Sequence, residues 1–219
     1  MGNYKKRIEE CADLESLFSI WKEAHKNEKN YEYTFPKNQD GIIPPEGFKT
    51  SWNDDGYLSE NKENIEILFV LKEPNDQTSI ENKYFGEKGF WLKDHIDNFR
   101  CAIPRRMFKT AEEKLGKGIT RKNWVTGAAV MNLNKRGGYN KTYCPDQISN
   151  YVDTYKDFIN REIEIINPQK IVFMCGINYS KIIIDTLNVS KYKVYYAPHP
   201  AAWGSDDNYL KKITEYPTE

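Results

Sequence analysis

Two side chains that can exchange protons, Glu73 and His199, stand shortly after apolar runs long enough to form buried strands. Glu73 follows the run 65–71 and His199 follows the run 193–197, each within a short turn built around proline. Ligands of open α/β sheets bind beyond the carboxyl ends of the strands. We therefore expect a carboxylate and an imidazole, distant in the sequence, to meet at one small-molecule site.

Asn132 is a third candidate because it follows a run of small apolar residues, GAAV at 127–130. A side-chain amide presents a hydrogen-bond donor and an acceptor side by side, which suits recognition of a polar ligand edge. The alternative is a strand-end amide that bonds to nearby backbone. His25 and His95 lack a comparable setting, and we expect both to lie at the surface.

Strand-length apolar runs alternate with segments in which apolar residues recur every three or four positions. This alternation predicts parallel pairing and a three-layer α/β/α sandwich with a mainly parallel central sheet. The stretch 27–60 is irregular but rich in aromatic residues, which disfavours disorder and indicates a loop or lid packed over the domain. We expect helices at 5–25, 107–115, 147–166 and 180–187, and strands at 65–71, 124–131, 170–175 and 194–197.

The length of 219 residues suits one α/β domain, with a core at 61–219 and a helix with an irregular extension at 1–60. Lys plus Arg and Asp plus Glu both number 32, so no global basic field marks a nucleic-acid or membrane partner. The four cysteines form no C-x-x-C pair, which disfavours a zinc site. No apolar run approaches the ~18 residues of a membrane span. These features predict a monomeric cytoplasmic protein with no membrane association, metal or cofactor.

Four short motifs, in order along the chain, resemble those of the uracil-DNA glycosylase superfamily, specifically its family 4 and family 5 branches. Members have a strand leading into a G-E-x-P-G turn, a P-F-x-G-x-x-G loop, a strand ending in N-x-x-K and a final H-P-[SA]-A-L motif. The matching segments here are LKEPN (71–75), YFGEKG (84–89), NLNK (132–135) and HPAAW (199–203). The resemblance covers about residues 65–203 and leaves the first 60 residues without a counterpart.

The resemblance implies a DNA glycosylase-like hydrolase that cleaves the N-glycosidic bond of uracil, or of another damaged or modified base flipped out of DNA, as in base excision repair. Such cleavage passes through an oxocarbenium-like sugar, while the departing base gains negative charge. By resemblance, Glu73 is the general base that orients water, and His199 donates a hydrogen bond to the charged base oxygen. Asn132 recognises the base, and Phe85 supplies the ring on which the base stacks.

Trp203 stands where similar enzymes carry the leucine that wedges into the duplex. An inserted apolar side chain offsets the cost of unstacking. The tryptophan can wedge in this way, stack on a single strand, or be buried after its strand. Lys135 and Arg136 begin a short basic loop beside the expected pocket, which suits phosphate contacts. The expected partner is therefore DNA, single- or double-stranded.

The chain also departs from the family. Leu71 and Asn75 replace the usual glycines and Lys72 has no counterpart, so Lys72 and Asn75 are expected to line the substrate site. Only Cys11 lies near the N-terminus, where family 4 has a close cysteine pair, so we expect no iron–sulfur cluster.

Two alternatives stay open. The first is a catalytically inactive module of the same type that binds a nucleotide or nucleic acid, which space for a water beside Glu73 would disfavour. The second is an unrelated Rossmann-like protein in which the strand-end histidine is coincidental. In that case positions 73, 85, 132 and 199 would not converge.

Overall fold

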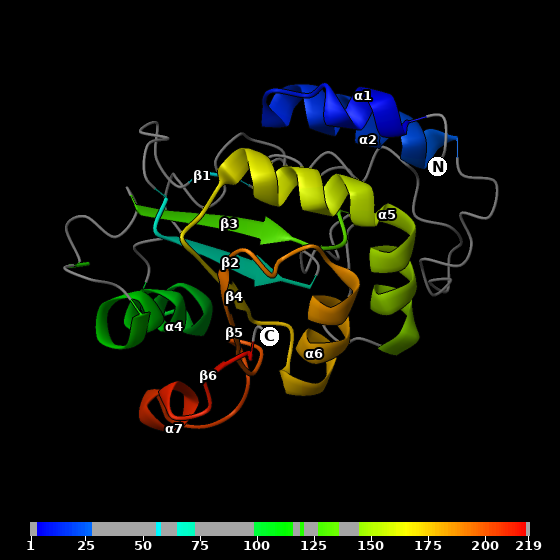
Figure 1. The fold of residues 1–219 in the computed structure, drawn as a ribbon. Coiled ribbons are helices and arrows are strands. Elements are labelled where there is room, and N and C mark those ends of the chain that lie inside the picture. The colour runs from blue at the N-terminus through cyan, green and yellow to red at the C-terminus, as the bar shows by residue number, and fades with distance from the viewer. Residues whose placement is uncertain are drawn as a thin grey trace, which may run out of the picture.

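The computed structural model shows helices alternating with strands (Figure 1). The helices are α1 (Lys5–Glu9), α2 (Leu14–Lys26), α4 (Ala102–Lys109), the π-helical η5 (Thr110–Leu115), α5 (Pro145–Ile166), α6 (Ile177–Thr186) and α7 (Asp206–Leu210). The structure describes residues 4–27, 56–57, 65–72, 99–115, 119–120, 127–135 and 145–217.

The strands of the described residues form one mixed sheet. They are β1 (Gly56–Tyr57), β2 (Ile67–Leu71), β3 (Ala128–Asn132), β4 (Lys170–Phe173), β5 (Lys193–Tyr196) and β6 (Thr214–Glu215). Their order across the sheet is β1-β3-β2-β4-β5-β6. The pairs β2–β3, β2–β4 and β4–β5 are parallel, whereas β1 and β6 run antiparallel to their neighbours. The prediction of an α/β protein with a mainly parallel sheet is confirmed.

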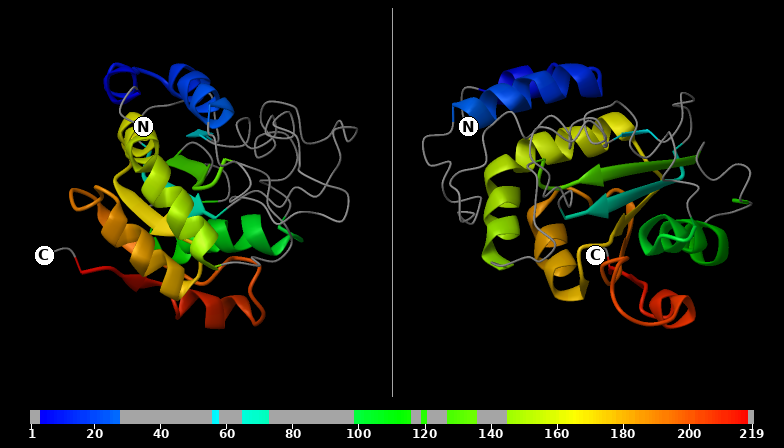
Figure 2. Two further views of the ribbon diagram at one scale, coloured as in Figure 1. Left: turned by 90° about the vertical axis from the view of Figure 1, so that its right-hand side faces the viewer. Right: turned by 180° about the vertical axis from the view of Figure 1, so that it is seen from behind.

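Helices cover both faces of this sheet, and strand β2 shows why. Leu68 and Val70 belong to the core cluster that also contains residues of α1, α2, α5 and α6. Ile67, Phe69 and Leu71 belong to the cluster that contains residues of α4 and α7. Successive side chains of a strand point to opposite faces, so a strand covered on both faces is apolar throughout. Figures 1 and 2 show α4 and α7 across the sheet from α5.

The chain takes opposite sides of the sheet after β2 and after β4. Helix α4, the first described element after β2, packs on one face, while α6 follows β4 and packs on the other. In addition, β3 lies on one side of β2 and β4 on the other. Where the connections of neighbouring strands diverge in this way, α/β proteins bind ligands beyond the carboxyl ends of the strands. The ends of β2 and β4 are therefore the place to look for a site.

The N-terminal segment forms two helices, so the prediction of one helix over 5–25 is wrong. Asp13 begins α2 by accepting the N–H of Ser16 on Oδ1 at 2.8 Å, and a residue with such cap geometry interrupts a continuous helix. On α2, Trp21 is fully buried and stacks on Phe158 of α5, with ring centroids 5.1 Å apart. Helices α1 and α2 therefore share the core cluster of α5, as their position above it in Figure 1 shows.

The prediction that His25 lies at the surface is also wrong. His25 is buried, and its Nε2 lies 2.9 Å from the hydroxyl oxygen of Tyr151. Its ring meets that of Tyr155 edge-on, with centroids 4.7 Å apart. The signal that was missed is helical spacing. His25 follows Trp21 by four residues, so both share one side of α2 and enter the same core.

The other predicted elements are present with shifted ends. Helix α4 begins at Ala102 and continues into η5, while α5 bends sharply at Tyr155, where φ is −109° (Figure 1). Helix α7 and strand β6 were not predicted, because five and two residues are too short to show a periodic pattern. The proposed lid at 27–60 lies almost entirely outside the described residues, as does His95.

Candidate functional site

Three of the candidate residues lie at the carboxyl ends of parallel strands. Asn132 is the last residue of β3, Lys72 directly follows β2, and His199 lies three residues beyond β5. Strands β2 and β3 stay bonded past their ends, because the N–H of Asn134 donates to the Lys72 carbonyl at 2.8 Å. Lys72 and Asn132 therefore lie on adjacent segments at the carboxyl-terminal edge of the sheet.

The imidazole of His199 is held in its neutral form. Burial, together with the positive charge of Lys72, lowers the pKa of His199 from 6.5 to about 4. Nδ1 of His199 accepts the backbone N–H of Ala201 at 3.2 Å. A neutral imidazole has one protonated and one bare ring nitrogen, so the proton must be on Nε2. The side chain therefore offers one N–H donor at Nε2 throughout the neutral pH range.

Lys72 approaches helix α6. It follows β2, and its Nζ lies 5.9 Å from the ring centroid of Tyr179 on α6, the helix that follows β4. Its effect on the pKa of His199 also places the ammonium and the imidazole in one electrostatic environment. A cation beside a neutral N–H donor favours an anionic or electron-rich group at this edge.

The other described positions of the first motif and the third motif are buried. The side chain of Leu71 packs in the core cluster with α4 and α7, so this departure from glycine is taken up by core packing. Asn132 is 2% exposed, and its carbonyl accepts a hydrogen bond from Lys135 Nζ at 2.7 Å. The polar end of β3 is thus fixed by a neighbouring side chain.

The prediction that Lys135 belongs to a short basic loop suited to phosphate contacts is wrong. Lys135 Nζ lies 2.6 Å from Glu162 Oε2 of α5, and both side chains are 0% exposed. Two rings of α2 face the ammonium, with centroids 5.4 Å (Phe18) and 5.0 Å (Trp21) from Nζ. The carboxylate and the aromatic faces replace the hydration of the cation, which is why a lysine can lie in the core here.

Trp203 is fully exposed, so the alternative that it is buried after its strand is wrong. The other large apolar side chain exposed in the described part of the chain, Ile182, is only 54% exposed. Trp203 lies between β5 and α7, beside Gly204, whose φ of +123° is a conformation that L side chains rarely adopt. The indole is therefore open to solvent on every side and accessible to a partner.

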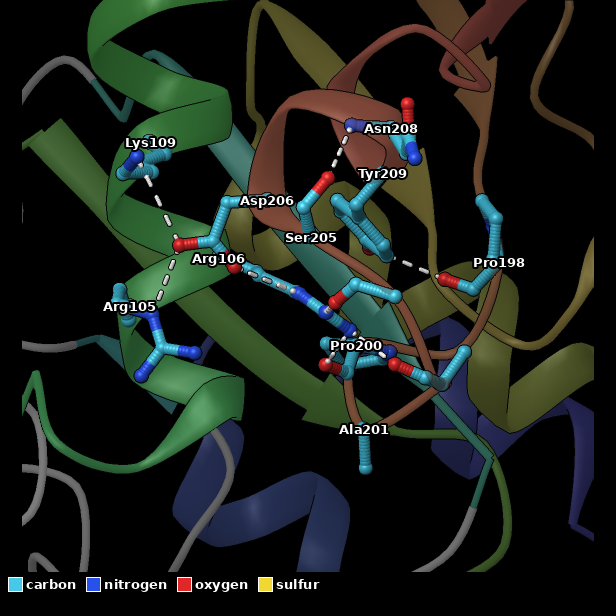
Figure 3. A network of polar contacts seen from close by, with 12 residues as sticks. Arg105, Arg106, Lys109, Pro198, Pro200, Ala201, Ser205, Asp206, Asn208 and Tyr209 are labelled. Atoms are coloured by element: carbon cyan, nitrogen blue, oxygen red, sulfur yellow. Dashed lines mark hydrogen bonds and ion pairs between the residues drawn. The ribbon is translucent and has the colours of Figure 1, made fainter.

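The loop that carries Trp203 is held from α4 by Arg106 (Figure 3). Arg106 is buried, and its guanidinium stacks on the ring of Tyr209, 4.8 Å from the centroid. Its Nη1 donates to the carbonyls of Pro200 at 2.8 Å and Ala202 at 2.5 Å, and its Nη2 to that of Gly204 at 2.6 Å.

Asp206 balances the charge of this arginine. Its Oδ1 accepts from Nε of Arg106 at 3.1 Å, and its Oδ2 accepts from Nε of Arg105 at 2.9 Å, with Lys109 Nζ at 3.6 Å (Figure 3). Hydrogen bonds from the two arginines hold the pKa of Asp206 below its usual value although burial opposes them. Sequence reasoning missed this cluster, because nothing in a pair of adjacent arginines shows that one is buried.

The remaining candidates, Glu73, Asn75, Phe85 and Arg136, lie outside the described residues. Glu73 is the next residue in the chain after Lys72, and Arg136 is the next after Lys135. Within the described ranges, no cluster of three or more His, Cys, Asp or Glu residues is suited to hold a metal ion. Among the helices described, none combines the length and the apolar character needed to cross a membrane.

The chain was compared with models of protein families, with curated proteins and with solved structures. None of the three comparisons gives a match.

Proposed function

We propose that the protein is a DNA glycosylase-like hydrolase of the uracil-DNA glycosylase type, which removes uracil or another damaged or modified base from DNA. The observation that carries this proposal is the neutral imidazole of His199, with Nδ1 occupied by the backbone and Nε2 left as the donor. A donor that is already oriented when a base departs stabilises the charge that develops on the base oxygen.

The chemistry assigns a task to each residue at the sheet edge. Cleavage of the N-glycosidic bond gives the sugar oxocarbenium character and the base negative charge. Nε2 of His199 donates to the base oxygen, and preorganised donors of this kind contribute roughly 3 to 4 kcal/mol. The ammonium of Lys72 stabilises the same anion through space. Glu73 orients the attacking water, and its carboxylate favours the positive sugar.

Recognition of the base falls to Asn132 and Phe85. The amide of Asn132 pairs with the edge of the pyrimidine at the end of β3, and the ring of Phe85 stacks on its face, an interaction worth roughly 1 to 3 kcal/mol. Trp203 takes the space that the flipped nucleotide vacates. Its full exposure supports this role, because a side chain that inserts between bases has to project from the protein surface.

The test is an incision assay with oligonucleotides that contain uracil, hypoxanthine or modified bases, single- and double-stranded. Glu73→Gln and His199→Ala should each reduce the release of free base at least about a hundredfold, the scale of a general base or an oxyanion donor. The control is Glu112→Gln, which replaces an exposed carboxylate of η5. This variant should release base at the wild-type rate.

Two outcomes would contradict the proposal. If the wild type binds these oligonucleotides but releases no base from any of them, the protein is a catalytically inactive module that binds nucleic acid. If it neither binds nor cleaves, the strand-end histidine serves another chemistry.

A further inference from the structure

The loop with His199 and Trp203 is fixed by hydrogen bonds to every second carbonyl along it. The hydroxyl of Tyr209 donates to the first of these carbonyls at 3.0 Å, and the guanidinium of Arg106 donates to the other three (Figure 3). The four carbonyls are those of Pro198, Pro200, Ala202 and Gly204. His199 and Trp203 therefore each lie between two carbonyls that accept such a bond.

Arg106 is suited to this task in a way that lysine is not. Four of its five N–H donors are used, three on the loop and one on Asp206. Its planar fork fixes the direction of each bond, whereas an ammonium is a point charge on a flexible stem. Hydrogen bonds from a charged donor are also stronger than neutral ones, and the stacking on Tyr209 fixes the plane of the fork.

We propose that Arg106 is a positioning residue, which holds the imidazole of His199 and the indole of Trp203 in their working geometry before DNA binds. The inference rests on the proposed function only for the role of that geometry in base release; the hydrogen bonds that hold the loop do not depend on it. The bond from the Ala201 N–H to Nδ1 of His199 depends on the turn of the loop, and this turn is closed by the Ala202 N–H on the His199 carbonyl at 2.8 Å. The positions of the carbonyls that Arg106 binds therefore determine which nitrogen of the imidazole carries the proton.

The test compares Arg106→Lys with Arg105→Lys in the full chain without DNA. Arg105 is the matched control because it is the adjacent arginine of α4 and bonds to the same Asp206, but its other bonds go to the carbonyls of Phe99 and Arg100 and not to the loop. The first readout is the ¹⁵N NMR signature of the His199 ring, which distinguishes the two neutral tautomers. The second is the ¹⁹F line width of Trp203 in protein labelled with 5-fluorotryptophan, assigned by its loss in Trp203→Phe.

In Arg106→Lys, we expect the His199 ring to lose its single Nε2–H tautomer and the Trp203 resonance to broaden or split, while Arg105→Lys matches the wild type. If the wild type releases base, the kcat/KM of Arg106→Lys should be roughly tenfold to a hundredfold lower than that of the wild type. A catalytic group misplaced by about 1 Å has an effect of this scale. A variant that is only less stable would keep the tautomer in its folded fraction.

Should Arg106→Lys fail to fold, Tyr209→Phe carries the same test, since it removes only the hydroxyl that binds Pro198 and keeps the ring under Arg106. The same two NMR changes, smaller in size, are then expected. An unchanged tautomer and an unchanged Trp203 line in the folded variant would overturn the inference, whatever the protein does to DNA. A loosened loop in a protein that releases no base would leave the inference in place and refute only the proposed function.

Discussion

Replacing Lys135 by methionine should destabilise the protein more than any surface substitution, because it removes a cation that pairs with the buried carboxylate of Glu162. The two side chains are 0% exposed and 2.6 Å apart. Breaking a buried pair from one side costs about 3 to 5 kcal/mol. The Asn132 carbonyl also loses its bond from Nζ, which adds about 1 kcal/mol. The two losses together are about 4 to 6 kcal/mol, which for a protein of this length lowers Tm by roughly 8 to 24 °C.

The double variant Lys135→Met/Glu162→Met gives the decisive comparison. Replacing a buried pair by apolar residues of similar volume is often neutral or stabilising, so the double variant should recover most of the Tm that the single variant loses. Thermal unfolding followed by circular dichroism measures both. The control is Lys156→Met, which breaks an exposed pair with Asp153 at 3.1 Å and should cost less than about 1 kcal/mol.

Two results would refute this reasoning. One is a Tm for Lys135→Met within experimental error of that for Lys156→Met, which would mean that the ammonium of Lys135 is hydrated in solution. The other is a double variant no more stable than Lys135→Met alone, which would mean that the cost comes from lost packing and not from the loss of the ion pair.

Three further predictions concern single sites. His199 should titrate near pH 4 by NMR; because its folded pKa is below the unfolded value of 6.5, its contribution to stability is fully present above pH 6.5 and falls as the pH drops from there towards 4. A titration near 6.5 in the folded protein would contradict its burial. Trp203→Ala should change stability by less than about 0.5 kcal/mol yet weaken oligonucleotide binding by about 1 to 3 kcal/mol, as measured by chemical denaturation and fluorescence anisotropy; unchanged binding would rule out stacking. Asp13→Ala should cost about 1 kcal/mol in urea denaturation, whereas Asp13→Asn should cost little because its amide oxygen can still accept the bond that begins α2.

The fold was predictable where burial leaves a periodic trace. Strands β2 and β4 are apolar on both faces, and α5 repeats its apolar positions over 22 residues, so both patterns are long enough to recognise. The break between α1 and α2 was missed because Asp13 also fits the polar side of a longer helix. Its effect depends on one hydrogen bond to Ser16, which sequence periodicity does not reveal.

The site was predictable in part, for a different reason. Parallel strands bring their carboxyl ends to one edge, so Lys72, Asn132 and His199 could be placed there from the strand pattern alone. Lys135 could not be placed, because its burial depends on Glu162 and on rings contributed by α2, more than a hundred residues away in the sequence. Arg106 was missed for the same reason, since its partners lie about 94 to 100 positions further along the chain.

Strand β6, the outer strand at one border of the sheet that the described residues form, limits how these molecules can associate. An outer strand offers unpaired N–H and C=O groups to any other extended chain, and proteins counter this with short strands, charges and proline. Strand β6 combines all three, because it has two residues, one of them Glu215, and is followed within two positions by Pro217, which has no N–H to donate. A second molecule therefore finds almost no backbone template at this border, and concentrated solutions should be protected from ribbon-like polymerisation through it.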